Sequence, residues 1–306
     1  MNNKVRLIGI IIMAVAVVFL VRRFLSFQVD FSKLFSVQTL PYIVLVTVAV
    51  MVTLLIGSIS WTIWLSFFSG QKVPILATFS IYARSNIAKY LPGNVGHYAM
   101  RQLYGASLGV KQTELLFSSI LEIFCMAITA FILSFLLARD VIFTFLSNSF
   151  QRVWVLPLLI VVIVVIVAGV GFFLRKKKIS VSEILSHLKK KEFRISLISV
   201  LGLIACNMAI YGVILLVLLR SHTDIGSSGL LIISAGIVSW FAGFITPGAP
   251  GGIGVREAVM VLMLSPIISE DIVLYVAVVQ RVAYIFSDVF TWVIGKAIFG
   301  TNSVGQ

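Results

Sequence analysis

The chain contains the stretch Pro92-Gly93-Asn94-Val95-Gly96, followed after four further residues by Arg101. A second copy begins 155 residues later as Pro247-Gly248-Ala249-Pro250-Gly251, continues through Gly252 and Gly254, and reaches Arg256 at the same spacing. Both copies follow the pattern P-G-x-x-G-x-x-x-x-R, and each interrupts an apolar stretch. Proline removes a backbone donor and glycine adopts dihedral angles closed to other residues, so both copies predict a broken helix.

Such a break has consequences inside a bilayer. The backbone groups that it frees must find partners in protein or in a water-filled cavity. Two broken segments at matching positions of two halves are typical of a transporter's binding site.

The composition indicates a polytopic membrane protein. Of 306 residues, 60% are hydrophobic and only 11% are charged, and a spanning helix needs about 20 mostly apolar residues. The net charge of +13 would suggest a nucleic-acid partner in a soluble chain. Here the basic residues cluster in connectors, above all at 175–194, as the positive-inside rule requires, so no nucleic-acid partner is expected.

The pattern of apolar segments predicts an all-α fold in one membrane domain, residues 1–306. Two stretches, 74–110 and 230–264, contain the turns and predict re-entrant hairpins. Six other segments are long enough to span the membrane: 5–24, 40–68, 113–138, 153–174, 196–219 and 272–299.

The two halves match when one is shifted by 155 residues, which predicts a repeat of residues 1–140 and 152–300. Each half has three crossings, so the halves are inverted relative to each other. Placing the basic connector 175–194 in the cytoplasm puts both termini there. The two hairpins then enter from opposite faces.

Arg101 and Arg256 are the strongest candidates for binding a ligand. Broken helix ends attract anions, and a guanidinium matches a phosphate bidentately. We therefore expect both arginines to engage a lipid phosphate. The alternative is that each pairs with carbonyls freed by its own turn or with a carboxylate, which for Arg256 could be Glu257, Glu122 or Asp288.

Two further basic residues precede the first turn. Arg84 and Lys89 could guide an anionic headgroup toward it. Alternatively, their side chains extend along apolar surface to reach the membrane interface.

Charged residues within apolar segments are expensive and are usually functional. Besides Arg256, the set comprises Glu122, Glu257, Arg281 and Asp288. Arg281 and Asp288 are seven residues apart on one helical face. They could act as a gate or proton relay, or form a static ion pair between helices.

Several enzyme classes lack their sequence signatures. The glycine-rich stretch at 251–254 is not followed by the Gly-Lys-Ser/Thr of a P-loop, and no G-x-S-x-G motif occurs. Three scattered histidines and two cysteines show no metal-ligand spacing, although His97, within the first motif, could donate to a headgroup. The expectation is a protein that is not an enzyme and has no metal or cofactor.

The two turns also carry a resemblance. The segments 89–101 and 247–258 resemble signatures of the lysylphosphatidylglycerol synthase transmembrane region, also called flippase-like integral membrane proteins. The resemblance covers essentially the whole chain. It implies a bacterial or archaeal cytoplasmic membrane and movement of an aminoacylated phospholipid between leaflets. The full synthase also carries an aminoacyltransferase domain, and this sequence ends soon after Gly300, so synthase activity is not expected.

Three function classes follow. The first is translocation of an anionic lipid (a phospholipid, an aminoacyl phospholipid or a polyprenyl-linked lipid) between leaflets. The second is a non-catalytic accessory protein that holds a cell-envelope glycosyl- or aminoacyltransferase at the membrane, with connector 175–194 as docking surface. The third, a membrane-embedded enzyme acting on lipid-linked sugars, lacks a convincing acid/base pair.

Overall fold

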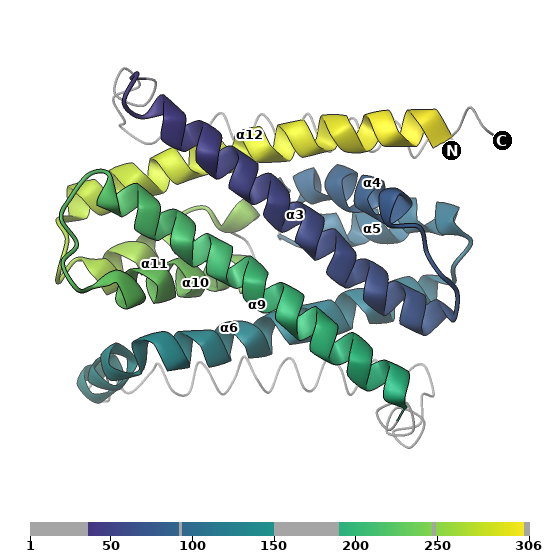
Figure 1. The fold of residues 1–306 in the computed structure, drawn as a ribbon, viewed down its shortest axis with the longest axis horizontal. Coiled ribbons are helices and arrows are strands. Elements are labelled where there is room, and N and C mark those ends of the chain that lie inside the picture. The colour runs from purple at the N-terminus through teal and green to yellow at the C-terminus, as the bar shows by residue number, and fades with distance from the viewer. Residues whose placement is uncertain (1–35, 92–93, 150–189, 247–248, 303–306) are drawn as a thin grey trace.

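The computed structural model describes residues 36–91, 94–149, 190–246 and 249–302, and these ranges are helical with short connections (Figure 1). Two of the predicted spans, 5–24 and 153–174, lie outside the described residues, as does most of the basic connector. So do four turn residues: Pro92, Gly93, Pro247 and Gly248.

This is a multi-pass membrane protein. Within the described ranges, four helices have spans long and apolar enough to cross a membrane, and they match four of the six predicted spans. They are α3 (Leu40–Ser69), α6 (Gln112–Ser149), α9 (Lys191–Arg220) and α12 (Glu270–Asn302).

The predicted end of the span 113–138 was wrong. A loop was expected after residue 138, whereas α6 continues to Ser149. Proline and glycine are the residues that break helices, and none occurs between residues 110 and 150. The single charged pair at Arg139 and Asp140 was therefore too weak a signal for a boundary.

The long helices expose apolar side chains on the face opposite to their packed face. In α3, Val44, Val48 and Val52 recur every four residues and are 56%, 54% and 43% exposed. On the other face of the same helix, Val46 and Val50 are buried. A helix that is apolar on both faces is suited to lipid on one side and protein on the other.

The first hairpin lies between α3 and α6. Its arms are α4 (Ile75–Asn86), extended by the 3-10 turn η1 (Ile87–Tyr90), and α5 (Gly96–Gly105). The short 3-10 turn η2 (Ala106–Leu108) then leads to α6. The second hairpin lies between α9 and α12. Its arms are α10 (Gly229–Ile245) and α11 (Val255–Leu264), with the 3-10 turn η3 (Pro250–Gly252) between them.

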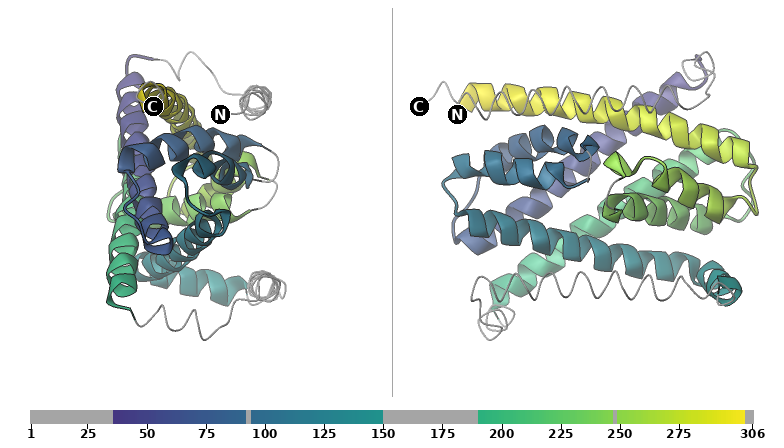
Figure 2. Two further views of the ribbon diagram at one scale, coloured as in Figure 1. Left: turned by 90° about the vertical axis from the view of Figure 1, so that its right-hand side faces the viewer. Right: turned by 180° about the vertical axis from the view of Figure 1, so that it is seen from behind.

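The helices thus break where the repeated motif predicted a break. Figure 1 and the right-hand view of Figure 2 show the hairpins pointing toward each other from opposite ends of the molecule. The broken tips meet near the centre, between α6 and α12. Helices α3 and α9 cross each other over one side of both hairpins. The described residues at each tip therefore come close to the other half of the chain.

Candidate functional site

The tip of the first hairpin caps a helix of the second. Asn94 adopts a left-handed conformation with φ 56°, unusual for a residue other than glycine. Its side-chain amide donates to the carbonyls of Gly243 (3.0 Å) and Phe244 (2.9 Å) in the last turn of α10. Carbonyls at a helix end lack intrahelical partners, so this one side chain satisfies two of them.

The tip of the second hairpin is held just as closely. Gly251 has φ +60°, and a Cβ there would lie 2.6 Å from the Tyr90 ring of the first hairpin. The Gly251 carbonyl accepts a hydrogen bond of 2.9 Å from Arg281 on α12. The glycine is therefore required both by its backbone conformation and by the ring against it.

Each hairpin is joined by one buried ion pair to the long helix that follows it. Arg101 on α5 binds Glu122 on α6 at 2.6 Å. Glu257 on α11 binds Arg281 on α12 at 2.8 Å, and its second carboxylate oxygen accepts from the Gly254 backbone at 2.7 Å. The two pairs occupy corresponding helices of the two halves, with the acidic and basic partners exchanged.

A third ion pair crosses between the halves. Asp288 on α12 binds Lys89 of the first hairpin at 2.8 Å. The same carboxylate accepts from the Asn86 amide at 2.7 Å and from the Tyr90 hydroxyl. Asp288 thus holds the segment 86–90, at the end of the first arm of the first hairpin, against α12.

Arg281 and Asp288 do not pair with each other. Seven residues of helix separate them by about 10 Å along the axis, at a rise of 1.5 Å per residue. Arg281 therefore reaches the second hairpin while Asp288 reaches the first. The prediction that they share a face is compatible with these separate partners.

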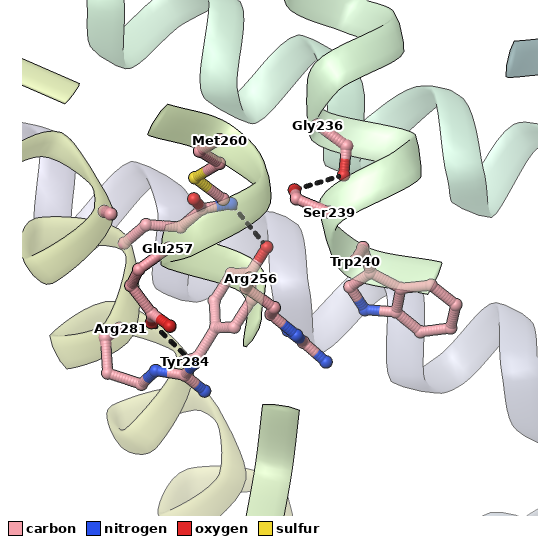
Figure 3. Close-up of a pocket in the computed structure, with 10 residues that line it drawn as sticks. Gly236, Ser239, Trp240, Arg256, Glu257, Met260, Arg281 and Tyr284 are labelled. Carbon is pink, nitrogen blue, oxygen red and sulfur yellow. Dashed lines mark hydrogen bonds and ion pairs between the residues drawn. The ribbon is translucent and has the colours of Figure 1, made fainter. Parts of the chain in front are cut away.

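Arg256 is the exception among these charged residues. It is only 8% exposed, yet the described part of the chain offers it no ion pair or hydrogen bond, and its Nε is fully buried without a partner. Its guanidinium lies 5.7 Å from the ring centres of both Trp240 and Tyr284. Figure 3 shows it pointing between these rings, while the neighbouring Glu257 turns away toward Arg281.

The three carboxylates proposed as partners of Arg256 are all engaged elsewhere. Glu122 binds Arg101, Glu257 binds Arg281 and Asp288 binds Lys89. Arg256 is thus a buried cation whose charge is not balanced by any described carboxylate.

Two glycines make room for the Arg256 side chain. A Cβ on Gly243 would lie 2.5 Å from its Cγ and 2.8 Å from its Nε. A Cβ on Gly252 would lie 2.7 Å from its Nε, and Gly252 also has φ +76°. The side chain therefore runs through a slot formed by the backbones of α10 and the second tip.

The slot opens onto a cavity of about 60 Å³ between the two tips. A water molecule needs roughly 10–15 Å³ of such volume, so the cavity has room for a few waters or a small polar group. It is lined by aromatic side chains from both halves and by a set of polar ones. The polar set is Thr53, Asn86, Lys89, Asn94, His97, Arg101, Asn207 and Arg256. A pocket of about 10 Å³, drawn in Figure 3, lies beside it, and Arg256 lines both.

Four of the predicted site residues meet at this cavity. Lys89, Arg101, Gly251 and Arg256 line the cavity. Arg84 does not: it is buried with its guanidinium 4.3 Å from the Tyr104 ring centre. The ion pairs described above hold four others, Glu122, Glu257, Arg281 and Asp288. Gly96 begins α5, and a Cβ there would meet the Ala88 carbonyl at 2.4 Å.

Sequence reasoning missed Asn207 and the aromatic lining. Asn207 is the one amide in the apolar core of α9, 7% exposed, and a polar residue inside a spanning segment was a usable signal. The rings of Tyr211, Trp240 and Tyr284 carried no comparable signal. Aromatic residues are common throughout this chain and only the fold selects which of them surround the cavity.

Groups of three or more His, Cys, Asp or Glu side chains that could hold a metal ion are not found in the described ranges. In a comparison with protein families, the model of the lysylphosphatidylglycerol synthase TM region matches residues 6–290. No curated protein and no solved structure matches the chain.

Proposed function

This chain belongs to the family of the lysylphosphatidylglycerol synthase TM region, and we propose that it moves an anionic lipid between the two leaflets of the membrane. The headgroup passes through the cavity between the hairpin tips while the acyl or polyprenyl tails stay in the bilayer. The protein itself carries out no chemical step on the lipid.

The observation that carries this proposal is the unbalanced charge of Arg256. A buried charge without a partner is strongly destabilising, by several kcal/mol. Here the guanidinium lies beside a cavity lined by donors from both halves of the chain. A phosphate entering that cavity supplies the missing acceptor, because two of its oxygens can accept together from the planar guanidinium.

The proposed architecture has six spanning helices and two opposed re-entrant hairpins in an inverted repeat. The described helices support it: α3 and α9 both have 30 residues, and α5 and α11 both have 10. Each half also has its ion pair at the same place, α5 to α6 and α11 to α12. Rocking of one half against the other would open the cavity to each leaflet in turn.

For the location we propose the cytoplasmic membrane of a prokaryotic cell, with both chain termini on the cytoplasmic side. This follows from the distribution of Lys and Arg between connectors. The first hairpin then opens toward the cytoplasm and the second away from it.

The test is lipid movement in proteoliposomes. The purified chain is reconstituted with an anionic phospholipid labelled on its tail, and bleaching of the outer leaflet reports exchange. We expect wild type to move the lipid, Arg256→Gln to reduce the rate at least tenfold, and Arg256→Lys to retain an intermediate rate because it keeps the charge but loses the bidentate geometry. Lys111→Gln removes the same charge from a side chain that is 83% exposed, and serves as control.

The outcomes separate the candidate functions. An Arg256→Gln rate equal to wild type would contradict the role of Arg256. Absence of movement by wild type, together with a stable transferase recovered with the chain, would favour the accessory protein. Turnover of a lipid-linked sugar by the purified chain would favour the embedded enzyme.

A second prediction concerns the slot rather than the charge. Gly243→Ala should lower lipid movement nearly as much as Arg256→Gln, because the added methyl group displaces the Arg256 side chain. Alanine is otherwise favourable in a helix by about 1 kcal/mol. Gly202→Ala on α9 is the matched control, since a Cβ there meets nothing within 4 Å. Equal rates for the two alanine variants would show that the position of Arg256 is unimportant.

A further inference from the structure

We infer that the headgroup accepted by the cavity is a single phosphodiester bearing uncharged hydroxyl groups, and that aminoacylated and phosphomonoester headgroups are disfavoured. This inference rests on the proposed function and names its substrate class. It follows from the charges, the ring contacts and the unsatisfied polar atoms of the cavity.

The charge of the lining admits one negative charge. Three cations line the cavity: Lys89, Arg101 and Arg256. Asp288 neutralises Lys89 and Glu122 neutralises Arg101, which leaves only Arg256. A phosphodiester carries one negative charge and balances it. A phosphomonoester, whose second pKa is about 6, carries close to two at neutral pH and leaves one of them unbalanced.

Among the described residues, no carboxylate near the tips is free to pair with an ammonium group. Each of the three carboxylates near the tips, Glu122, Glu257 and Asp288, is already bound to a cation of the protein. A carboxylate shared with an incoming ammonium would therefore have to give up its present partner. Next to Arg256, a cationic headgroup also meets a like charge.

Four aromatic rings that line the cavity are already in contact with arginine side chains of the protein. The Arg101 guanidinium lies 3.6 Å from the Tyr82 ring centre and 5.1 Å from that of Tyr98. Arg256 faces Trp240 and Tyr284. Aromatic rings commonly bind quaternary and primary ammonium ligands, but here these four rings already face the protein's own guanidinium groups.

Two buried polar atoms of the lining point to hydroxyl groups. Asn207 donates its Nδ2 to the Thr53 carbonyl at 3.3 Å, which leaves its Oδ1 buried without a partner. His97, 5% exposed, has a buried Nδ1 that also lacks one. Carbonyl oxygen accepts only, and a ring nitrogen accepts or donates according to tautomer, so a hydroxyl satisfies both atoms. A glycerol or sugar group supplies such hydroxyls.

The same chemistry occurs in two kinds of lipid. One is a glycerophospholipid with a glycerol headgroup, and the other is a polyprenyl phosphate esterified to a sugar. Both present one phosphodiester charge and neutral hydroxyls. The experiment therefore includes both.

The experiment measures movement of tail-labelled lipids by the full chain in proteoliposomes of otherwise identical composition. The lipids are phosphatidylglycerol, a polyprenyl phosphohexose, phosphatidylmethanol, phosphatidate, phosphatidylethanolamine and lysylphosphatidylglycerol. We expect phosphatidylglycerol, the polyprenyl phosphohexose or both to move at least tenfold faster than phosphatidate and lysylphosphatidylglycerol. Phosphatidylmethanol, a phosphodiester without hydroxyls, should be intermediate.

The variant Asn207→Leu tests the hydroxyl contact. It should lower the rate ratio of phosphatidylglycerol to phosphatidylmethanol about fivefold or more, and His97→Phe should act in the same direction. A ratio of two lipids in one preparation does not depend on how much of the variant folds. An unchanged ratio in both variants overturns the hydroxyl assignment.

The failure of this inference differs from failure of the proposed function. If lysylphosphatidylglycerol or phosphatidate moves as fast as phosphatidylglycerol, the headgroup assignment is wrong while lipid movement stands. If none of the lipids moves in the presence of wild type, both are wrong.

Discussion

Glu122→Gln should lower the free energy of unfolding by about 3–5 kcal/mol, one of the two largest effects that we expect from a single substitution. Glu122 and Arg101 are 0% and 2% exposed and lie 2.6 Å apart. Tyr82 donates a further hydrogen bond of 3.2 Å to the same carboxylate. Removing the negative charge leaves the buried Arg101 guanidinium without its carboxylate partner. The measurement is an equilibrium unfolding titration with SDS in mixed micelles.

The double variant Glu122→Gln, Arg101→Gln provides the critical control. Replacing both members of a buried pair by neutral groups costs far less than removing one, so most of the lost stability should return. Glu114→Gln on the same helix breaks an exposed pair with Lys111 at 3.9 Å and should cost less than 1 kcal/mol. If Glu122→Gln were as mild as Glu114→Gln, the pair would not be buried as described.

The breaks at the two tips were predictable because their cause is local. Proline and glycine act on the backbone of their own residues, so an interrupted helix can be inferred from a few residues of sequence. The flanking helices end at Tyr90 and Ile245 and resume at Gly96 and Val255, as the repeated motif indicated.

It was harder to predict from the sequence which of the two arginines lacks a carboxylate partner. Arg101 and Arg256 occupy the same position in the motif, yet Glu122 neutralises only the first. That outcome depends on how α5 packs on α6 and α11 on α12, over separations of 21 and 24 residues. One part of this outcome could be inferred from the sequence. Adjacent residues on a helix do not face each other, so Glu257 was a poor partner for Arg256.

The contacts between the halves could not be inferred from either half alone. Asn94 reaches Gly243 over 149 residues, and Lys89 reaches Asp288 over 199. Asp288 was predicted as a charged residue within an apolar segment and Lys89 as a guide for the headgroup before the first turn, and neither prediction joined the two. Their pairing depends on the first hairpin meeting α12, which only the three-dimensional arrangement specifies.

Asp288→Asn should change both stability and headgroup preference, the second large effect. Asp288 holds Lys89 at 2.8 Å and Asn86 at 2.7 Å, and also accepts from Tyr90. Its loss should cost about 3 kcal/mol, toward the lower end for a buried pair, because the Lys89 side chain is 20% exposed and keeps some access to water. Asparagine retains one acceptor oxygen for the two neutral donors.

The change in preference follows from the charge of the cavity. With Asp288 neutral, Lys89 joins Arg256 as a second unbalanced cation in the lining, and a headgroup with two negative charges becomes the better match. In the proteoliposome assay, the ratio of phosphatidate to phosphatidylglycerol movement should therefore rise at least tenfold over wild type. Lys89→Met added to Asp288→Asn removes the extra charge and should restore the wild-type ratio, even where the stability is not restored. The two substitutions change the charge of the lining at one place and in opposite directions. If the ratio is the same in wild type, in Asp288→Asn and in the double variant, the charge of the lining does not select the headgroup.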